Sequence, residues 1–186
     1  DEERVRIALA LNDVGVREIE AGFPAVSPER TGYLDELVRL RRSGRITSRL
    51  IGWHRPVSDE VAHSAARGLD GCAISVPSSA GLIRDVLGKD EAWVIDQMRA
   101  SVGRAKDCNL YVVADYQDAF AADEGFLIAL STAMRDAGAD RIRLCDTVGR
   151  ATPEQVTKRL GSLMDAVDTD LELHAHNDLG LAVANA

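Results

Sequence analysis

Cysteine is scarce in this chain of 186 residues. Its three cysteines, Cys72, Cys108 and Cys145, are an odd number, lie far apart and form no Cys-x-x-Cys pair. A disulfide framework uses an even set, and a thiolate zinc site uses paired cysteines, so the pattern argues against both. We therefore expect a reducing, cytoplasmic setting and structural roles for all three, with Cys145 acting as a small buried hydrophobic residue.

Long apolar runs and a basic surplus are also missing. No stretch approaches the roughly 20 apolar residues of a membrane span, and the acidic opening "DEERVRIA" does not read as a signal peptide. The formal net charge of −8 offers no basic stripe for binding phosphates. We therefore expect neither a membrane nor a nucleic acid as partner. A hydrophobic content of 46% at this length predicts one globular domain over residues 1–186.

What the chain does have is a regular alternation of strand-like and helix-like segments. Amphipathic helices are expected at residues 2–15, 35–44, 91–107, 124–138 and 153–167, the last with Thr152 as N-cap and Pro153 at its first position. Between the helices, β-branched and apolar runs predict strands near residues 16–22, 46–54, 72–77, 110–116, 141–147 and 171–176. A spacing of about 30 residues per unit indicates parallel strands joined by helical crossovers.

The polarity of the strand faces separates a barrel from an open sheet. The first strand carries no Gly-x-Gly-x-x-Gly, which an open dinucleotide-binding sheet would show. In "RIRLCDT", Arg143, Cys145 and Thr147 share one face, whereas a sheet covered by helices on both sides should be apolar on both. The sequence thus predicts an α/β fold of the TIM (β/α)8 barrel type. It is incomplete, because about six of the eight strands are present.

Two histidines on one strand are the most informative feature. In "LELHAHND", His174 and His176 alternate with apolar residues, so both rings point the same way. Imidazole pairs of this kind bind divalent cations, and Asn177 and Asp178 follow where they would orient the ligands. On spacing alone, one histidine buried in the core and one exposed to solvent explain the pattern as well.

Five longer motifs carry a family resemblance. The chain resembles the DRE-TIM metallolyase superfamily, in particular its homocitrate, 2-isopropylmalate and citramalate synthases, and most of all the homocitrate synthases of nitrogenase cofactor assembly. The motifs are "GVREIEAGFPAVSPE" (15–29), "ISVPSS" (74–79), "LGKDEAWVI" (87–95), "DTVG" (146–149) and "HAHNDLGLAVANA" (174–186).

The resemblance implies an activity and a metal site. Enzymes of this family condense acetyl-CoA with a 2-oxo acid and then hydrolyse the thioester, in amino-acid biosynthesis or nitrogen fixation. A divalent cation (Zn²⁺, Mg²⁺ or Mn²⁺) assists them, and His174 and His176 match two of its ligands. The family's third ligand lies in a first-strand motif, "DxxLRDGxQ", which this sequence lacks. The family also implies a homodimer in which C-terminal helices complete the active sites. Those helices are expected to carry the general base and are not part of this sequence, so no general base is assigned.

Three further residues match substrate-binding positions of the family, and Arg84 is a fourth candidate that lies about one residue out of register. Thr147 matches a threonine that binds the oxo-acid carboxylate, a role that its inward position favours over the alternative of capping the turn into the next helix. Glu20 matches an inward glutamate, or is a solvated charge at a strand end. His54 matches a histidine that reads the distal carboxylate of 2-oxoglutarate, or is a loop histidine. Arg84 is a candidate cation for the same carboxylate, or a solvated helix residue.

Other positions depart from the family pattern or leave alternatives open. Gln117 stands where the family carries a carboxylate, and Arg143 is expected to form salt bridges inside the barrel. Trp53 and Trp93 are expected to pack helices against the barrel. The sequence favours homocitrate synthesis from 2-oxoglutarate, with 2-isopropylmalate or citramalate synthesis as the alternative. A lyase of the hydroxymethylglutaryl-CoA type and a non-catalytic binding protein are further alternatives.

Overall fold

The computed structural model describes residues 1–186 apart from the side chains of residues 28–30, so the last two side chains of the motif at 15–29 lie outside it. Its strands are β1 (Glu18–Gly22), β2 (Arg49–His54), β3 (Gly71–Pro77), β4 (Tyr111–Gln117), β5 (Arg141–Asp146) and β6 (Asp170–Ala175). Its helices are α1 (Glu2–Asp13), α2 (Pro28–Arg42), α3 (Ser58–Arg67), α4 (Glu91–Asp107), α5 (Glu124–Asp136), α6 (Pro153–Ala166) and α7 (Ala182–Asn185), with short turns η1 (Leu82–Val86) and η2 (Ala119–Ala121).

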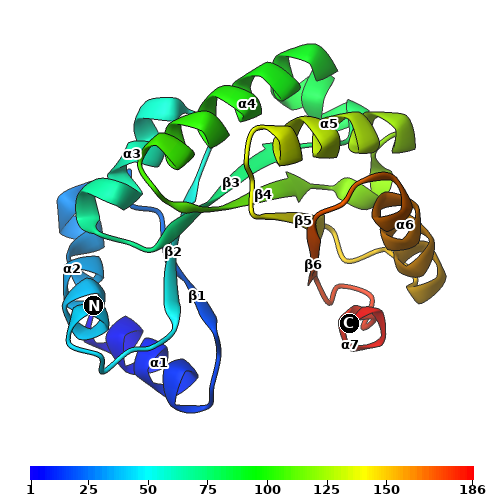
Figure 1. Cartoon of the computed structure of the whole chain (residues 1–186). Coiled ribbons are helices and arrows are strands. Elements are labelled where there is room, and N and C mark those ends of the chain that lie inside the picture. Colours follow the sequence, from blue (N-terminus) through cyan, green and yellow to red (C-terminus); the bar gives the residue numbers. More distant parts are fainter.

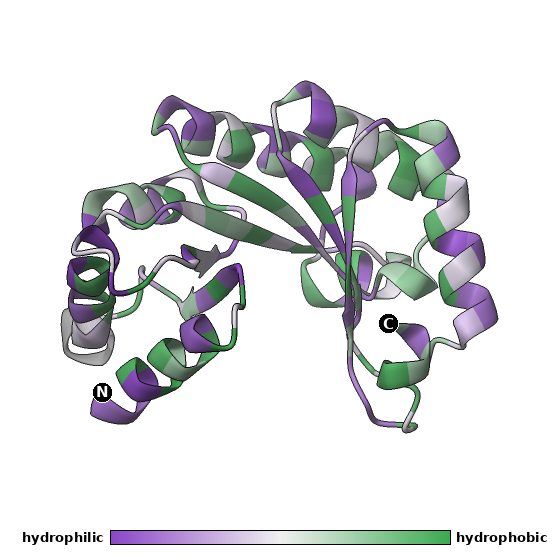
Figure 2. Ribbon diagram, turned by 60° about the horizontal axis from the view of Figure 1, so that its bottom comes forward, coloured by the Kyte–Doolittle hydropathy of each residue, from purple (hydrophilic) through white to green (hydrophobic). Residues whose placement is uncertain are grey.

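The strands form one parallel sheet in the order β1-β2-β3-β4-β5-β6. Figure 1 shows the sheet curling into a trough, with α3, α4, α5 and α6 on its outer side and the two chain ends on either side of the opening. The same opening is visible in Figure 2, which looks at the sheet from another side. This is a partial TIM barrel of six strands, as the sequence predicts. In the described part of the chain, no helix is long and apolar enough to cross a membrane.

The main core lies between the outer face of the sheet and the helices. Ile74, Ile142 and Leu144 point outward and pack with Met98 of α4 and Leu130 of α5, all of them essentially free of solvent contact. Burying such a side chain fully contributes roughly 1.5–3 kcal/mol, so this layer stabilises the curl of the sheet. The predicted N-cap is confirmed as well, because Thr152 and Gln155 form a reciprocal capping box at the start of α6.

Helix α3 is not among the helices that the sequence predicts, and a glycine allows it to pack closely against the sheet. Gly52 lies under α3, and a Cβ atom on Gly52 would collide with the Ser64 side chain and lie 2.8 Å from Pro24. A residue without a side chain therefore lets this helix approach β2 closely. The only well-buried side chains of α3 are Val61 and Ser64, which explains why apolar periodicity did not reveal it.

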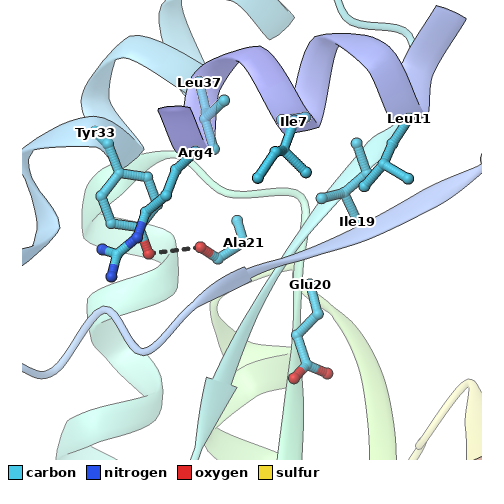
Figure 3. Close-up of a pocket in the computed structure, with 9 residues that line it drawn as sticks. Arg4, Ile7, Leu11, Ile19, Glu20, Ala21, Tyr33 and Leu37 are labelled. Carbon is cyan, nitrogen blue, oxygen red and sulfur yellow. Dashed lines mark hydrogen bonds between the residues drawn. The ribbon is translucent and has the colours of Figure 1, made fainter. Parts of the chain in front are cut away.

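Strand β1 forms one open edge of the sheet. Helix α1 lies across its outer face, and a cavity of about 310 Å³ remains between them, lined by Ile7, Leu11 and Ile19 among others. Figure 3 shows the Tyr33 hydroxyl donating to the carbonyl of Ala21 beside this cavity, and Glu20 pointing away from α1. Side chains of β1 thus alternate between α1 and the hollow of the barrel.

Candidate active site

Inward side chains from four neighbouring strands form a polar layer across the barrel. The strand register places Ser75, Asp115, Arg143 and Glu172 side by side on β3, β4, β5 and β6. Such layers are usually filled by branched apolar side chains. A charged layer at this depth therefore needs its own hydrogen bonds and ion pairs to be stable.

Arg143 connects the charges of this layer. Its Nη1 lies 2.7 Å from Oε2 of Glu20, and its Nε lies 2.8 Å from Oε1 of Glu172. Its Nη1 also lies 3.9 Å from Oδ1 of Asp115. Burial alone would lower the pKa of Arg143, but these carboxylates more than offset it and raise that pKa. The predicted salt bridges inside the barrel are confirmed.

The network continues towards the N-terminal end of the strands. Glu172 also pairs with Arg141, at 2.9 Å between Oε2 and Nε, and Arg141 pairs in turn with Glu18. Glu18 lies 2.5 Å from Nη1 of Arg49, whose guanidinium covers the Tyr111 ring at 3.8 Å. An unbroken chain of ion pairs therefore runs from the floor of the barrel up to the polar layer.

Cys145 sits next to Asp115 and is bonded to it. Its thiol donates to Oδ1 of Asp115 across 2.9 Å, and both residues are buried. Burial and the neighbouring carboxylate raise the pKa of the Cys145 thiol, so the proton stays on sulfur. The cysteine is buried, as the sequence indicates, but its role as a hydrogen-bond donor was not foreseen.

The two histidines lie above this layer at the end of β6. The rings of His174 and His176 are stacked, with centroids 5.1 Å apart and planes 2° from parallel. Both rings are exposed and line the same cavity, so they fit two ligand positions of one divalent cation. In the part of the chain that the structure describes, no group of three histidine, cysteine, aspartate or glutamate side chains could hold such a cation. The ligand set that these residues offer is thus partial.

Thr147 follows β5 at the same mouth. Its Oγ1 accepts a hydrogen bond from the backbone N–H of Asp118 at 2.8 Å, which fixes the hydroxyl and leaves its hydrogen available to donate. The residue does not cap the next helix, because Thr152 does so. Its hydroxyl is therefore held at the cavity rather than used in helix capping.

One cavity of about 330 Å³ brings these groups together. Gln117 is fixed in its wall by a 3.0 Å hydrogen bond from Nε2 to Oγ of Ser75. Trp53 was expected to pack against helices but lies on the inner face of β2, with its ring 5.2 Å from that of Phe23 in an edge-to-face contact. The lining residues are Glu20, Trp53, Ser75, Asp115, Gln117, Arg143, Cys145, Thr147, His174 and His176.

Two of the residues expected to bind substrate lie away from this cavity. His54 ends β2 with its side chain turned towards α3, where its Nε2 lies 2.7 Å from Oγ of Ser64. Burial lowers the pKa of His54 to about 4, which keeps the ring neutral. Arg84 belongs to η1, is largely exposed and pairs with its neighbour Asp85 at 2.7 Å.

The residues that follow the histidines shape the loop. Oδ1 of Asn177 accepts a hydrogen bond from the backbone N–H of Ala182 at 3.1 Å and thereby fixes the turn into α7. Asp178 is exposed and lies against Gly149, where a Cβ atom would be only 2.7 Å from the backbone nitrogen of Asp178. Gly149 has a φ of +61°, so a glycine there permits both the turn and the close approach. These contacts join the loops that carry Thr147 and His176.

Comparison with known proteins shows the family to which the chain belongs. A family model described as HMGL-like matches residues 1–186. The chain belongs to the HMGL-like family. Its curated relatives include 2-isopropylmalate synthase 2 of Caldanaerobacter subterraneus subsp. tengcongensis, 35% identical over 99% of the chain and 47% of the relative. They also include the homocitrate synthase of Frankia alni, 36% identical over 98% of the chain and 51% of the relative. A third is the 2-phosphonomethylmalate synthase of Streptomyces rubellomurinus, 35% identical over 99% and 48%.

Solved structures of hydroxymethylglutaryl-CoA lyases share the fold. The hydroxymethylglutaryl-CoA lyase of Pseudomonas aeruginosa matches 99% of the chain and 64% of its own with a TM-score of 0.80 at 16% identity. The HMG-CoA lyase of Brucella melitensis matches 98% and 68% with a TM-score of 0.74 at 20% identity. The chain spans about half the length of the curated relatives it matches. The family resemblance seen in the sequence is confirmed.

Proposed function

We propose that the complete protein condenses acetyl-CoA with a 2-oxo acid and then hydrolyses the thioester to release CoA. The observation that carries this proposal is the placement of His174, His176 and Thr147 around one cavity at the C-terminal end of parallel strands, where TIM barrels carry out their chemistry. The names of the curated relatives support it, because all three are synthases that form a 2-substituted malate or homocitrate.

In the reaction, a methyl proton of acetyl-CoA is removed and the resulting enolate carbon bonds to the ketone carbon of the oxo acid. The ketone oxygen then takes up a proton, and water cleaves the thioester into a carboxylate and free CoA. His174 and His176 would hold a divalent cation (Zn²⁺, Mg²⁺ or Mn²⁺), which supplies Lewis-acid stabilisation of charge on oxygen when bound. The hydroxyl of Thr147 donates to the oxo-acid carboxylate, and Arg143 holds Glu20 in the cavity wall.

The identity of the oxo acid depends on which protein groups contact its side chain. The sequence favours 2-oxoglutarate, whose distal carboxylate needs a cation or a donor. His54 faces α3 and Arg84 is paired with Asp85 in solvent, so neither supports a distal-carboxylate site in this cavity. The geometry therefore favours a 2-oxo acid with an uncharged side chain, the broad class to which the substrates of the 2-isopropylmalate and citramalate alternatives also belong. A role in amino-acid biosynthesis follows from either substrate, whereas a role in nitrogen fixation requires 2-oxoglutarate.

The lyase alternative is less well supported. The solved lyases share the fold at 16% and 20% identity, a level that concerns the fold and not the reaction. The curated relatives at 35–36% identity are synthases. The homodimer and the cytoplasmic location remain predictions, for which size-exclusion chromatography and cell fractionation of the complete protein are the tests.

The decisive test is CoA release from acetyl-CoA by the complete protein, with Mg²⁺, Mn²⁺ or Zn²⁺ and a panel of 2-oxo acids. We expect oxo-acid-dependent release that is lost in a His174→Ala/His176→Ala variant and retained in His63→Ala, a variant of an exposed histidine on α3. Cleavage of hydroxymethylglutaryl-CoA without any oxo-acid-dependent release would favour the lyase. No reaction with either substrate would favour a binding role.

A further inference from the structure

Asp115 is a buried carboxylate on the wall of the cavity, with 4% of its surface exposed. The Cys145 thiol and Arg143 both approach the same oxygen, Oδ1, at 2.9 and 3.9 Å. The other oxygen, Oδ2, has no hydrogen-bond partner in the described part of the chain and is not sealed from solvent. Asp115 therefore presents one free acceptor to whatever fills the cavity.

The positive charge near Asp115 belongs to Arg143 and is already paired with other carboxylates. Arg143 forms its short contacts with Glu20 and Glu172 rather than with Asp115. Among the described residues that line the cavity, no other arginine or lysine is present. A second carboxylate brought to this wall would therefore meet a like charge, with no unpaired cation among these lining residues beside it.

The position of Asp115 determines which part of a substrate it meets. Asp115 is paired in register with Ser75 and Arg143, one inward position below Gln117 on β4. An oxo acid held at Thr147 and the histidines has its carboxylate and ketone at the mouth, through which acetyl-CoA must also enter. Its side chain therefore extends down into the cavity, towards the layer of Asp115.

We propose that Asp115 determines specificity, selecting a 2-oxo acid whose side chain ends in an uncharged hydrogen-bond donor, namely a hydroxyl. This inference rests on the proposed function and deepens it by naming the substrate class. The thiol of Cys145 positions the carboxylate by holding Oδ1, so that Oδ2 accepts from the substrate hydroxyl. Because a buried acceptor left without a donor is costly, the site rejects an apolar side chain of the same size as well as a charged one.

The test compares three oxo acids in the CoA-release assay with the complete protein and Mg²⁺. They are 4-hydroxy-2-oxobutanoate, its near-isostere 2-oxopentanoate, and 2-oxoglutarate. We expect kcat/KM for the hydroxy acid to exceed that for either competitor by at least about tenfold. In Asp115→Ser, the ratio of 2-oxoglutarate to hydroxy acid should rise by at least about tenfold, because the repulsive charge is gone.

Matched variants keep the result interpretable. Asp96→Asn, which removes an exposed carboxylate on α4, should leave all three ratios unchanged. Asp115→Asn preserves the side-chain shape and serves if the serine variant does not fold. A wild-type preference for 2-oxoglutarate or 2-oxopentanoate, or unchanged ratios in both Asp115 variants, overturns the inference and leaves the proposed function intact. No CoA release with any oxo acid overturns the proposed function and the inference together.

Discussion

Replacing Arg143 by methionine should lower the free energy of unfolding of the barrel by more than the replacement of a surface charge does. The change keeps an unbranched, largely apolar stem but removes the guanidinium group, the cation that three carboxylates share. Removing one partner of a buried ion pair costs about 3–5 kcal/mol, since it leaves an uncompensated buried charge. The Glu20 and Glu172 side chains are 39% and 29% exposed and are partly screened by water, whereas that of Asp115 is 5% exposed. The lower end, about 3 kcal/mol, is therefore expected.

Urea unfolding of the complete protein, followed by tryptophan fluorescence, measures this loss as a change in the free energy of unfolding. Arg99→Met is the matched control, because Arg99 forms a 3.5 Å pair with Asp96 on the exposed face of α4. Adding Asp115→Asn to Arg143→Met should recover part of the loss, since it removes the carboxylate least able to reach water. Equal stabilities for Arg143→Met and Arg99→Met would refute the claim that the charged layer depends on Arg143.

Two further predictions concern stability. The pKa of His54 is lowered from 6.5 to about 4 by burial, so the unfolded chain takes up a proton first as pH falls. Between those two pH values the free energy of unfolding should fall by roughly 3 kcal/mol through this residue. Urea titrations at pH 7 and 4.5 measure this fall, which should be absent in His54→Gln. An imidazole that titrates near pH 6.5 by NMR would contradict the prediction. Thr152→Ala breaks the capping box of α6 and should lower the free energy of unfolding by about 1 kcal/mol in the same assay. The control Thr157→Ala, within that helix, should cost less. An equal cost for the two variants would argue against a stabilising cap.

The sequence predicts the sheet and one face of the site well, because period-two patterns are explicit there. In "RIRLCDT" the polar and apolar residues alternate, so the inward positions of Arg143 and Thr147 could be deduced. In "RLIGWH" the residues are apolar on both faces, and alternation cannot tell which side chains point inward. The outward turn of His54 and the inward position of Trp53 therefore required the structure.

Contacts between residues far apart in the sequence could not be predicted, for a different reason. The bond between Cys145 and Asp115 joins residues 30 positions apart, and it depends on the stagger between β4 and β5. A shift of that stagger by one residue would turn one of the two side chains to the outer face. Composition and spacing do not fix the stagger, so the pairing has no signal in a single sequence.

The ion-pair chain through the barrel has a consequence for how this protein has changed over time. Replacing Arg141, Arg143 or Glu172 by an uncharged residue would leave a partly buried charge on the neighbouring strand without its partner. Such a change survives when a second substitution removes or reverses the stranded partner. Across a deep collection of relatives, these three positions should therefore vary as a correlated set, while apolar positions on the outer face vary one at a time.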